Sequence, residues 1–216
     1  MFTSMKKILF TFIVVIMMTI NGFAQYKPFQ FGLSFSPSIC TTKSKCDIID
    51  NGITKLSYNW GFKGNFYFVE NYGFSTGFNI LNIRGGYTYN DNTYGEIDSY
   101  IKNQYLEIPL TILMRTERIG RFRIAGNIGY GIGFRINSFQ ENFDYKDNAI
   151  EIDNQFSLIR HALIFKIGTE FNVYKSSCLS AFLVYNNNFS NIYKNNNPLE
   201  HNVSLNNLSL EIDFVF

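Results

Sequence analysis

Residues 105–113 read YLEIPLTIL, and the two sides of this stretch differ in chemical character. Its even-numbered residues, from Leu106 to Ile112, are all apolar, and they would form one face of a β-strand because successive side chains in a strand point to opposite faces. Glu107 and Pro109 fall on the other face, where a carboxylate and a missing N–H group would be costly in an apolar core. The sheet therefore needs one apolar face and one face that accepts charge.

The composition favours β-structure over helix and disorder. The 216 residues are 46% hydrophobic and 18% aromatic, which is too apolar for a disordered chain and sufficient for one domain. The chain has 23 Phe and 14 Tyr but only 4 Pro, and beyond the N-terminus no segment keeps the spacing of an amphipathic helix. We therefore expect an all-β protein.

The first 24 residues have the order of a secretory signal peptide. Lys6 and Lys7 precede an uncharged, mainly apolar run over residues 8–20, which is followed by small residues up to Ala24. We expect cleavage after Ala24, so that residues 1–24 are the signal peptide and residues 25–216 form one mature domain. A transmembrane anchor is the alternative, but the run is shorter than the ~20 residues that span a bilayer.

The mature chain is electrically neutral. Removing the two lysines of the signal peptide from the 19 basic residues leaves 17, which equals the 17 acidic residues. We therefore expect no nucleic acid partner, since such proteins usually carry an excess of positive charge.

Alternation of apolar and other residues returns eight times after the signal peptide. In the clearest case, apolar side chains at even positions from Phe122 to Ile136 alternate with glycine, asparagine and arginine. In the third case we expect the alternation to slip at Leu81 and Ile83, where apolar residues occupy odd positions. The eight predicted strands lie at residues 29–36, 58–68, 72–80, 105–114, 121–136, 163–173, 179–185 and 208–216.

The polar face of these strands consists of small residues and scattered charges, unlike the water-facing side of a soluble β-sandwich. A small closed barrel explains this, because its narrow lumen admits small side chains and paired charges while its outer face meets lipid. We expect an eight-stranded antiparallel up-and-down transmembrane β-barrel, with a bulge or a local break in pairing at Pro109. The predicted lumen charges are Lys63, Glu107, Arg123, Arg135, Lys166, Glu170, Glu211 and Asp213.

The predicted connections alternate between short and long. Short joins lie near residues 69–71, 116–120 and 175–177, and long ones span residues 37–57, 84–99, 137–159 and 187–202. Outer-membrane barrels have short periplasmic turns, long extracellular loops and both termini in the periplasm, whereas a secreted β-sandwich has no reason to sort its loops by end. We therefore expect a protein of the cell outer membrane with periplasmic N- and C-termini.

Several features resemble one known family. They are the YLEIPL of residues 105–110, the junction of Ala24 and Gln25, the glycine-alternating fifth strand and the terminal Phe216. Together they are similar to the PorT-like outer-membrane β-barrel family of Bacteroidota, often described as porin-family proteins. The resemblance covers essentially all of the mature chain. It implies an integral outer-membrane protein, and one branch of the family takes part in assembly of the type IX secretion system.

The end of the last strand resembles a targeting signal. Phe214, Val215 and Phe216 are similar to the C-terminal signal that is read by the barrel-insertion machinery. We therefore expect that machinery and outer-membrane lipid as partners of a monomeric barrel.

The three cysteines divide into a close pair and a single residue. Cys40 and Cys46 lie in one predicted extracellular loop and are close enough in sequence to form a disulfide in an oxidising compartment. Cys178 begins the seventh predicted strand and would remain a free thiol.

The sequence carries no motif for catalysis or for binding a metal ion or a cofactor. It has two histidines, and HExxH, CxxC and a glycine-rich phosphate loop are absent. An acyl-transferring or hydrolytic enzyme would use His161 or His201 as the base and Ser157 or Ser190 as the nucleophile. We expect instead that these four are ordinary polar loop residues and that the protein is not an enzyme.

Two functions from different classes fit the expected barrel. The first is a structural or interaction protein whose lumen is filled by side chains and whose long loops or periplasmic turns bind a protein partner. The second is a transport pore for small solutes. Because eight strands enclose an interior that side chains just fill, we favour the first function.

Overall fold

The computed structural model describes residues 28–44, 49–91, 95–144, 149–150, 156–174, 177–194 and 203–216. The predicted signal peptide, its cleavage site, Cys46 and His201 lie outside these residues.

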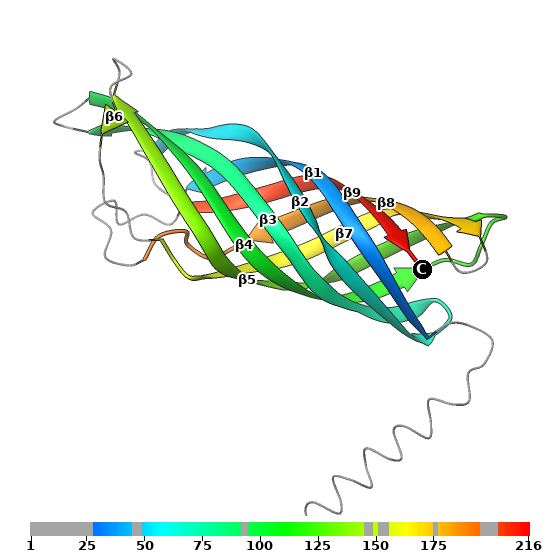
Figure 1. The fold of residues 1–216 in the computed structure, drawn as a ribbon. Coiled ribbons are helices and arrows are strands. Elements are labelled where there is room, and N and C mark those ends of the chain that lie inside the picture. Colours follow the sequence, from blue (N-terminus) through cyan, green and yellow to red (C-terminus); the bar gives the residue numbers. More distant parts are fainter. Residues whose placement is uncertain are drawn as a thin grey trace, which may run out of the picture.

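Eight long strands form one closed antiparallel sheet (Figure 1). Each long strand pairs with the next one along the chain, including β4 with β5. The first strand, β1, pairs with the last, β9, and this pairing closes the ring. The two-residue strand β6 pairs only with β5 and is not part of the ring. This confirms the predicted all-β, eight-stranded up-and-down barrel. The strands are β1 (Phe29–Ser44), β2 (Ile49–Val69), β3 (Tyr72–Asp91), β4 (Gly95–Arg115), β5 (Phe122–Asp144), β6 (Ala149–Ile150), β7 (Ile159–Tyr174), β8 (Ser177–Asn188) and β9 (Val203–Val215).

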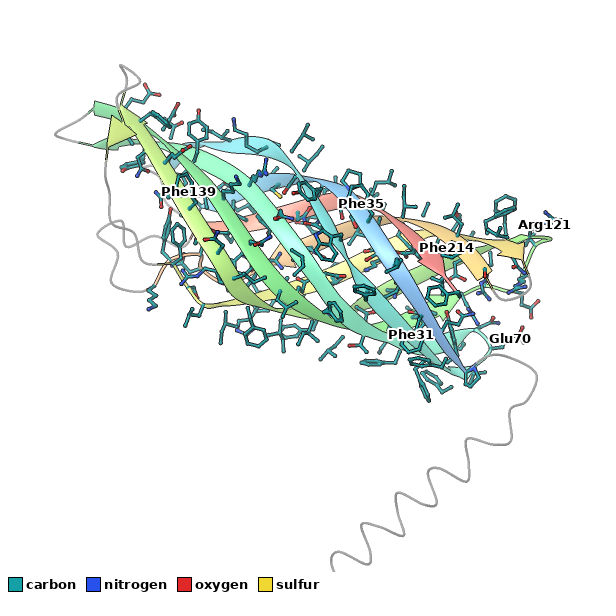
Figure 2. The ribbon with its side chains drawn as sticks, in the orientation of Figure 1. Phe31, Phe35, Glu70, Arg121, Phe139 and Phe214 are labelled. Carbon is teal, nitrogen blue, oxygen red and sulfur yellow. The ribbon has the colours of Figure 1, made fainter. Side chains whose placement is uncertain are left out.

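The outer face of the barrel is apolar and its inner face is polar over much of its length. Figure 2 shows Phe31, Phe35 and Phe214 pointing away from the barrel, and about half of each side chain is exposed. On β4, Ile108 and Leu110 are exposed on the outer face, while the neighbouring Glu107 points inward and is 1% exposed. No helix of the described residues is long and apolar enough to span a membrane. Such an outer surface suits hydrocarbon, which explains how Glu107 and its apolar neighbours share one strand.

Pro109 interrupts the pairing of β3 with β4 without shifting it. The register runs from Thr76 opposite Leu110 to Asn79 opposite Glu107, so the pairs that would join Gly77 to Pro109 and Phe78 to Ile108 are missing. On the other side, Pro109 stays in register with Gly131 of β5. Proline has no N–H group to donate to the ladder, and the structure accommodates this by a local break rather than by a bulge.

The strands are longer than the sequence pattern predicted at one end of the barrel. Most of the residues assigned to the loops 37–57 and 84–99 belong to β1–β4, and residues 137–144 of the loop 137–159 belong to β5. β3 and β4 are joined by residues 92–94 alone. That prediction was wrong because the arms of these hairpins continue to pair beyond the apolar belt, where apolar side chains of β3 and β4 point into the lumen and polar ones point outward. We call this end the mouth of the barrel.

The opposite end holds the short turns, as predicted. β2 and β3 are separated by residues 70–71, β5 follows β4 after residues 116–121, and β7 and β8 are separated by residues 175–176. Glu70 and Arg121 (Figure 2) and the C-terminus (Figure 1) lie at this same end. Phe216 exchanges backbone hydrogen bonds of 2.8 and 3.2 Å with Phe31 of β1, which fixes the chain end to the wall.

The interior changes character between the two ends. The side chains of Leu81 and Ile83 are 2% and 1% exposed and point inward like the other odd-numbered residues of β3. The predicted slip of the alternation at these residues was therefore wrong: the strand keeps its facing, and the lumen itself becomes apolar toward the mouth. The buried apolar cluster there consists of Cys40, Leu81, Ile83, Tyr87, Tyr89, Ile97, Ile101, Tyr105, Phe156, Ile192, Tyr193, Val203 and Leu205.

Gly77 lies opposite Pro109, where the pairing of β3 with β4 is interrupted, and it packs closely against β2. Its φ of 156° is rare for other residues, and an added Cβ would lie 2.0 Å from the carbonyl oxygen of Phe62. We expect Gly77→Ala to lower the free energy of unfolding by ~2 kcal/mol or more, because the backbone of β2 would have to move. Urea unfolding of the barrel in lipid vesicles measures the change.

Gly64 on β2 provides the matched control for this variant. A Cβ at Gly64 would meet the Phe29 ring at 3.6 Å, which is an ordinary contact. Gly64→Ala should change the free energy of unfolding by less than ~1 kcal/mol. Equal effects of the two substitutions would contradict the role assigned to Gly77.

Candidate functional site

The lumen between the mouth and the turns is closed by buried ion pairs. In the first, Arg160 of β7 donates from Nη1 to Oε2 of Glu107 on β4 over 2.7 Å. The two side chains are 2% and 1% exposed. They come from strands on either side of β5, so this pair spans one wall of the barrel.

A second group of charges joins β7 to two further strands, β2 and β9. Lys63 of β2 contacts Asp213 and lies 3.2 Å from Oε1 of Glu211, both on β9. Lys166 of β7 donates to both carboxylate oxygens of Glu211 at 2.7 Å. Two cations therefore share two carboxylates, and this group is neutral.

A third group lies near the turns. Arg123 of β5 donates from Nε to Oε2 of Glu170 on β7, and Nη1 of Arg115 lies 3.8 Å from the same oxygen. The guanidinium of Arg115 also lies 3.7 Å from the centre of the Tyr67 ring, in a cation–π contact. This group carries one net positive charge among these three ionised residues.

The structure places seven of the eight predicted lumen charges in these ion pairs. Arg135 is the exception: its guanidinium lies 5.9 Å from the ring centre of Phe156, nearer the mouth. No acidic partner contacts it within the part of the chain that the structure describes. The pairing of β5 with β4 shifts by one residue just past Arg135, between the partners of Tyr105 and Gln104. The alternation therefore predicted that Arg135 faces the lumen, but it did not predict what Arg135 contacts.

The sequence pattern missed Arg160 and Arg115. Arg160 lies between the predicted loop 137–159 and the predicted strand 163–173, although it has the same parity as Lys166 and the other inward residues of β7. Beginning that strand three residues earlier would have included it. Arg115 ends β4, and nothing in the sequence shows that its side chain folds back over the Tyr67 ring.

The ion pairs leave almost no free space. The space beside Glu107, Lys166 and Glu211 has a volume of about 10 Å³, which is roughly enough for one water molecule. Gly131 of β5 makes room for the Glu107 carboxylate, since an added Cβ would lie 2.9 Å from its Oε2. The glycines of β5 therefore let longer side chains from β4 and β7 fill the lumen.

Side chains from the connections close the mouth above this layer. Phe156 and Tyr193 pack with ring centres 5.3 Å apart, and the Tyr193 hydroxyl lies 2.8 Å from that of Tyr87 on β3. Backbone hydrogen bonds from Ser157 to Ile192 and from Ile192 to Val203 hold these segments in place. Burial, followed by the nearby Tyr87, raises the pKa of Tyr193 well above its ordinary value, so its phenol stays neutral at physiological pH.

Comparison with known proteins identifies the kind of barrel. A family described as the outer membrane protein beta-barrel domain matches residues 23–194. The chain belongs to this family. It is therefore an outer-membrane β-barrel, with its apolar outer face in lipid. No curated protein sequence matches it.

Solved structures show the same architecture. The outer-membrane barrel is similar to OprG from Pseudomonas aeruginosa, at 10% sequence identity and a TM-score of 0.53, over 88% of this chain and 97% of OprG. It also matches Neisserial surface protein A at 11% identity and a TM-score of 0.49, over 87% of this chain and 96% of that protein. At such low identity, the likeness to OprG shows the fold alone.

The predicted disulfide needs one correction in this outer-membrane barrel. Cys40 does not lie in a loop but in β1, where its side chain points inward and is 0% exposed among the apolar residues of the mouth. It is a free thiol, and its predicted partner Cys46 lies outside the described residues. Cys178 begins β8 as predicted and is a buried free thiol.

The histidine and serine candidates do not form a catalytic pair among the described residues of the outer-membrane barrel. His161 lies on the outer face of β7, and its Nδ1 is 2.6 Å from the hydroxyl of Tyr130. The Ser190 hydroxyl donates to Asn188 and accepts from the backbone N–H of His161. The Ser157 hydroxyl donates to the carbonyl of Ile159. Both serines therefore shape the backbone of the connections.

The Glu107 and Arg160 pair should stabilise this outer-membrane barrel strongly. We expect Glu107→Ala or Arg160→Ala alone to lower the free energy of unfolding by ~3–5 kcal/mol, because each leaves an unpaired charge in a closed lumen. The double variant Glu107→Ala with Arg160→Ala should lose less than the sum of the single losses. Urea unfolding in lipid vesicles gives all three values.

Arg118 serves as the control because it is exposed in the turn after β4. Arg118→Ala should shift the same free energy by less than ~0.5 kcal/mol. Strictly additive losses in the double variant would mean that Glu107 and Arg160 do not act as a pair.

Proposed function

We propose that this outer-membrane protein is a plugged barrel that acts as a structural or interaction protein. The observation that carries the proposal is the closed lumen, where paired charges fill the middle and the aromatic side chains of Phe156 and Tyr193 fill the mouth. A conducting pore needs a continuous column of water and often an excess of one charge. A barrel without such a column can act through the surfaces at its two ends.

The mouth is the better candidate for binding a protein partner. The strands of the β2–β5 wall extend there beyond the apolar belt, and residues 156–158 and 189–194, the described parts of the connections before β7 and after β8, pack over the lumen. The stretch 105–110 resembles the PorT-like family, one branch of which takes part in assembly of the type IX secretion system, so such assembly is one specific form of this role. Crosslinking in the native outer membrane, followed by purification of the barrel, would identify the partner.

We further propose that the turn end faces the periplasm and the mouth faces the outside of the cell. The short turns and the C-terminus share one end, which is the arrangement of outer-membrane barrels whose termini remain in the periplasm. Export by the signal peptide at residues 1–24 and recognition of Phe214 and Phe216 by the insertion machinery belong to this proposal.

Conductance distinguishes a plugged barrel from a pore. The purified protein in planar lipid bilayers should show no stable, stepwise conductance, with a porin of known conductance as the positive control. A variant with Phe156→Ser and Tyr193→Ser should also remain closed, because the ion pairs block the lumen below the mouth. Reproducible steps from the wild-type protein would instead support transport of small solutes.

Single cysteines test the orientation, because the native Cys40 and Cys178 are buried. In a background with Cys46→Ser, a membrane-impermeant maleimide applied to whole cells should label Lys102→Cys, on the mouth half of β4. Arg118→Cys, in a turn, should be labelled only after the outer membrane is permeabilised. The reverse pattern would place the turns outside the cell.

A further inference from the structure

A groove lies on the outer face of the wall formed by β2–β5, toward the mouth. It has a volume of about 390 Å³, and it is separate from the lumen. Gly85 on β3 contributes to its lining. The side chains that matter for its chemistry are Lys55, Arg84, Tyr100, Lys102, Phe139 and Phe143.

The groove lies just beyond the apolar belt. On the outer face, Ile80 of β3 pairs with Leu106 of β4, while Arg84 and Lys102 pair four residues further toward the mouth. Four residues of strand measure ~14 Å, and the tilt of barrel strands reduces the height to ~10 Å. Between the two rows, Asn82 and Gln104 share a hydrogen bond of 3.1 Å. This change from apolar to polar to basic side chains matches the passage from hydrocarbon to lipid headgroups.

Positive charge gathers in the groove without an internal partner for each cation. Arg84 and Lys102 lie directly opposite each other on neighbouring strands, where like charges repel. Glu141 of β5 is the one acidic residue that lines the groove within the described part of the chain. The Nε atom of Arg84 is buried and has no hydrogen-bond partner among the described residues. An anion in the groove would relieve the repulsion and accept this hydrogen bond.

Lys55 adds a third cation from a different strand. β2 has an irregularity in its pairing with β3 between Thr54 and Asn59. From this region Lys55 extends over β3, so that its Nζ lies 4.7 Å from the centre of the Tyr100 ring on β4. The cation–π contact holds the ammonium group over the groove while leaving its N–H donors available to a ligand.

An apolar path connects the groove with the lipid-facing belt. Along β5, Phe134, Ile136 and Phe139 are 45%, 56% and 54% exposed on the outer face. Figure 2 shows Phe139 on the outside of the barrel near the mouth. The rings of Phe143 and Tyr100 lie 6.0 Å apart at the far side of the groove. An occupant can therefore contact basic and aromatic side chains together.

We propose that this groove binds the phosphate-bearing headgroup of a membrane lipid in the outer leaflet. The phosphate lies against Arg84 and Lys102, with Lys55 nearby, and an acyl chain follows Ile136 and Phe134 into the hydrocarbon. A free phosphate ion would use the cations but not the aromatic path. The inference rests on the orientation proposed above, since that orientation places the groove in the outer leaflet.

Binding of a phosphorylated glycolipid by the purified barrel tests this inference. The full mature protein in detergent is mixed with lipid A, and non-denaturing mass spectrometry measures the fraction with bound lipid. The double variant Arg84→Gln with Lys102→Gln should bind at least ~10-fold less lipid A than the wild type, since charge-assisted contacts to phosphate are lost. Dephosphorylated lipid A should bind to the wild type as weakly as lipid A binds to the variant.

Two controls separate this site from general attraction to charge and from misfolding. Arg118→Gln with Arg121→Gln removes the same charge from an exposed turn and should leave binding unchanged; an equal loss would overturn the proposal. If the double variant in the groove does not fold, Lys102→Gln alone changes an exposed side chain and should reduce binding ~3-fold. No reduction in that variant would also overturn it.

Competition and labelling complete the test. Excess inorganic phosphate should displace little lipid A, whereas complete displacement would show a site for the free ion and would overturn the assignment to lipid. Stepwise conductance of the wild-type barrel would contradict the proposed plugged lumen, but it would not contradict lipid binding in the groove. Labelling of Lys102→Cys only after permeabilisation would reject the orientation, and with it the outer leaflet, while phosphate recognition could still be measured.

Discussion

The closed ladder of backbone hydrogen bonds is the constraint on which the rest of this structure depends. Lipid offers no partners to backbone N–H and C=O groups, so the sheet must return to itself, and the pairing of β1 with β9 achieves this. Closure fixes the direction of every side chain, because neighbours along a strand alternate between lipid and lumen. Even Pro109 is accepted only with Gly77 opposite it and an unchanged register on both sides.

A small closed barrel must then fill its own interior. Near the turns and in the middle, Lys63, Glu107, Arg160 and their partners neutralise one another across the lumen. Toward the mouth, the connections supply Phe156 and Tyr193, which pack on apolar residues of β3. Two different chemistries, ionic and apolar, thus close successive parts of the same lumen.

The period-two pattern was sufficient to predict the strand number, the facing of most side chains and seven members of the ion pairs, because lipid outside and charge inside make opposite demands on alternate residues. The pattern failed toward the mouth, where the wall extends beyond the apolar belt and the lumen no longer carries paired charges. Leu81, Ile83 and Cys40 departed from the predicted pattern because the lumen at the mouth is apolar while the outer face there becomes polar, so the apolar residues occupy the inward positions. Arg160 was missed because the predicted strand began at residue 163, whereas β7 begins at Ile159. Which cation meets which carboxylate depends on strand register, which the alternation alone does not fix.

The position of Lys63 has a consequence for biogenesis. Its two carboxylate partners, Glu211 and Asp213, lie 148 and 150 residues further along the chain, on the last strand. While the sheet is still open, this lysine has no countercharge from β9, and the same event that joins β9 to β1 also brings the carboxylates to it. Neutralisation of the lumen and sealing of the wall are therefore a single late step of assembly, with a long loop-closure entropy to overcome. A chain truncated before Glu211 would retain most of its strands and still present an unpaired cation to the membrane.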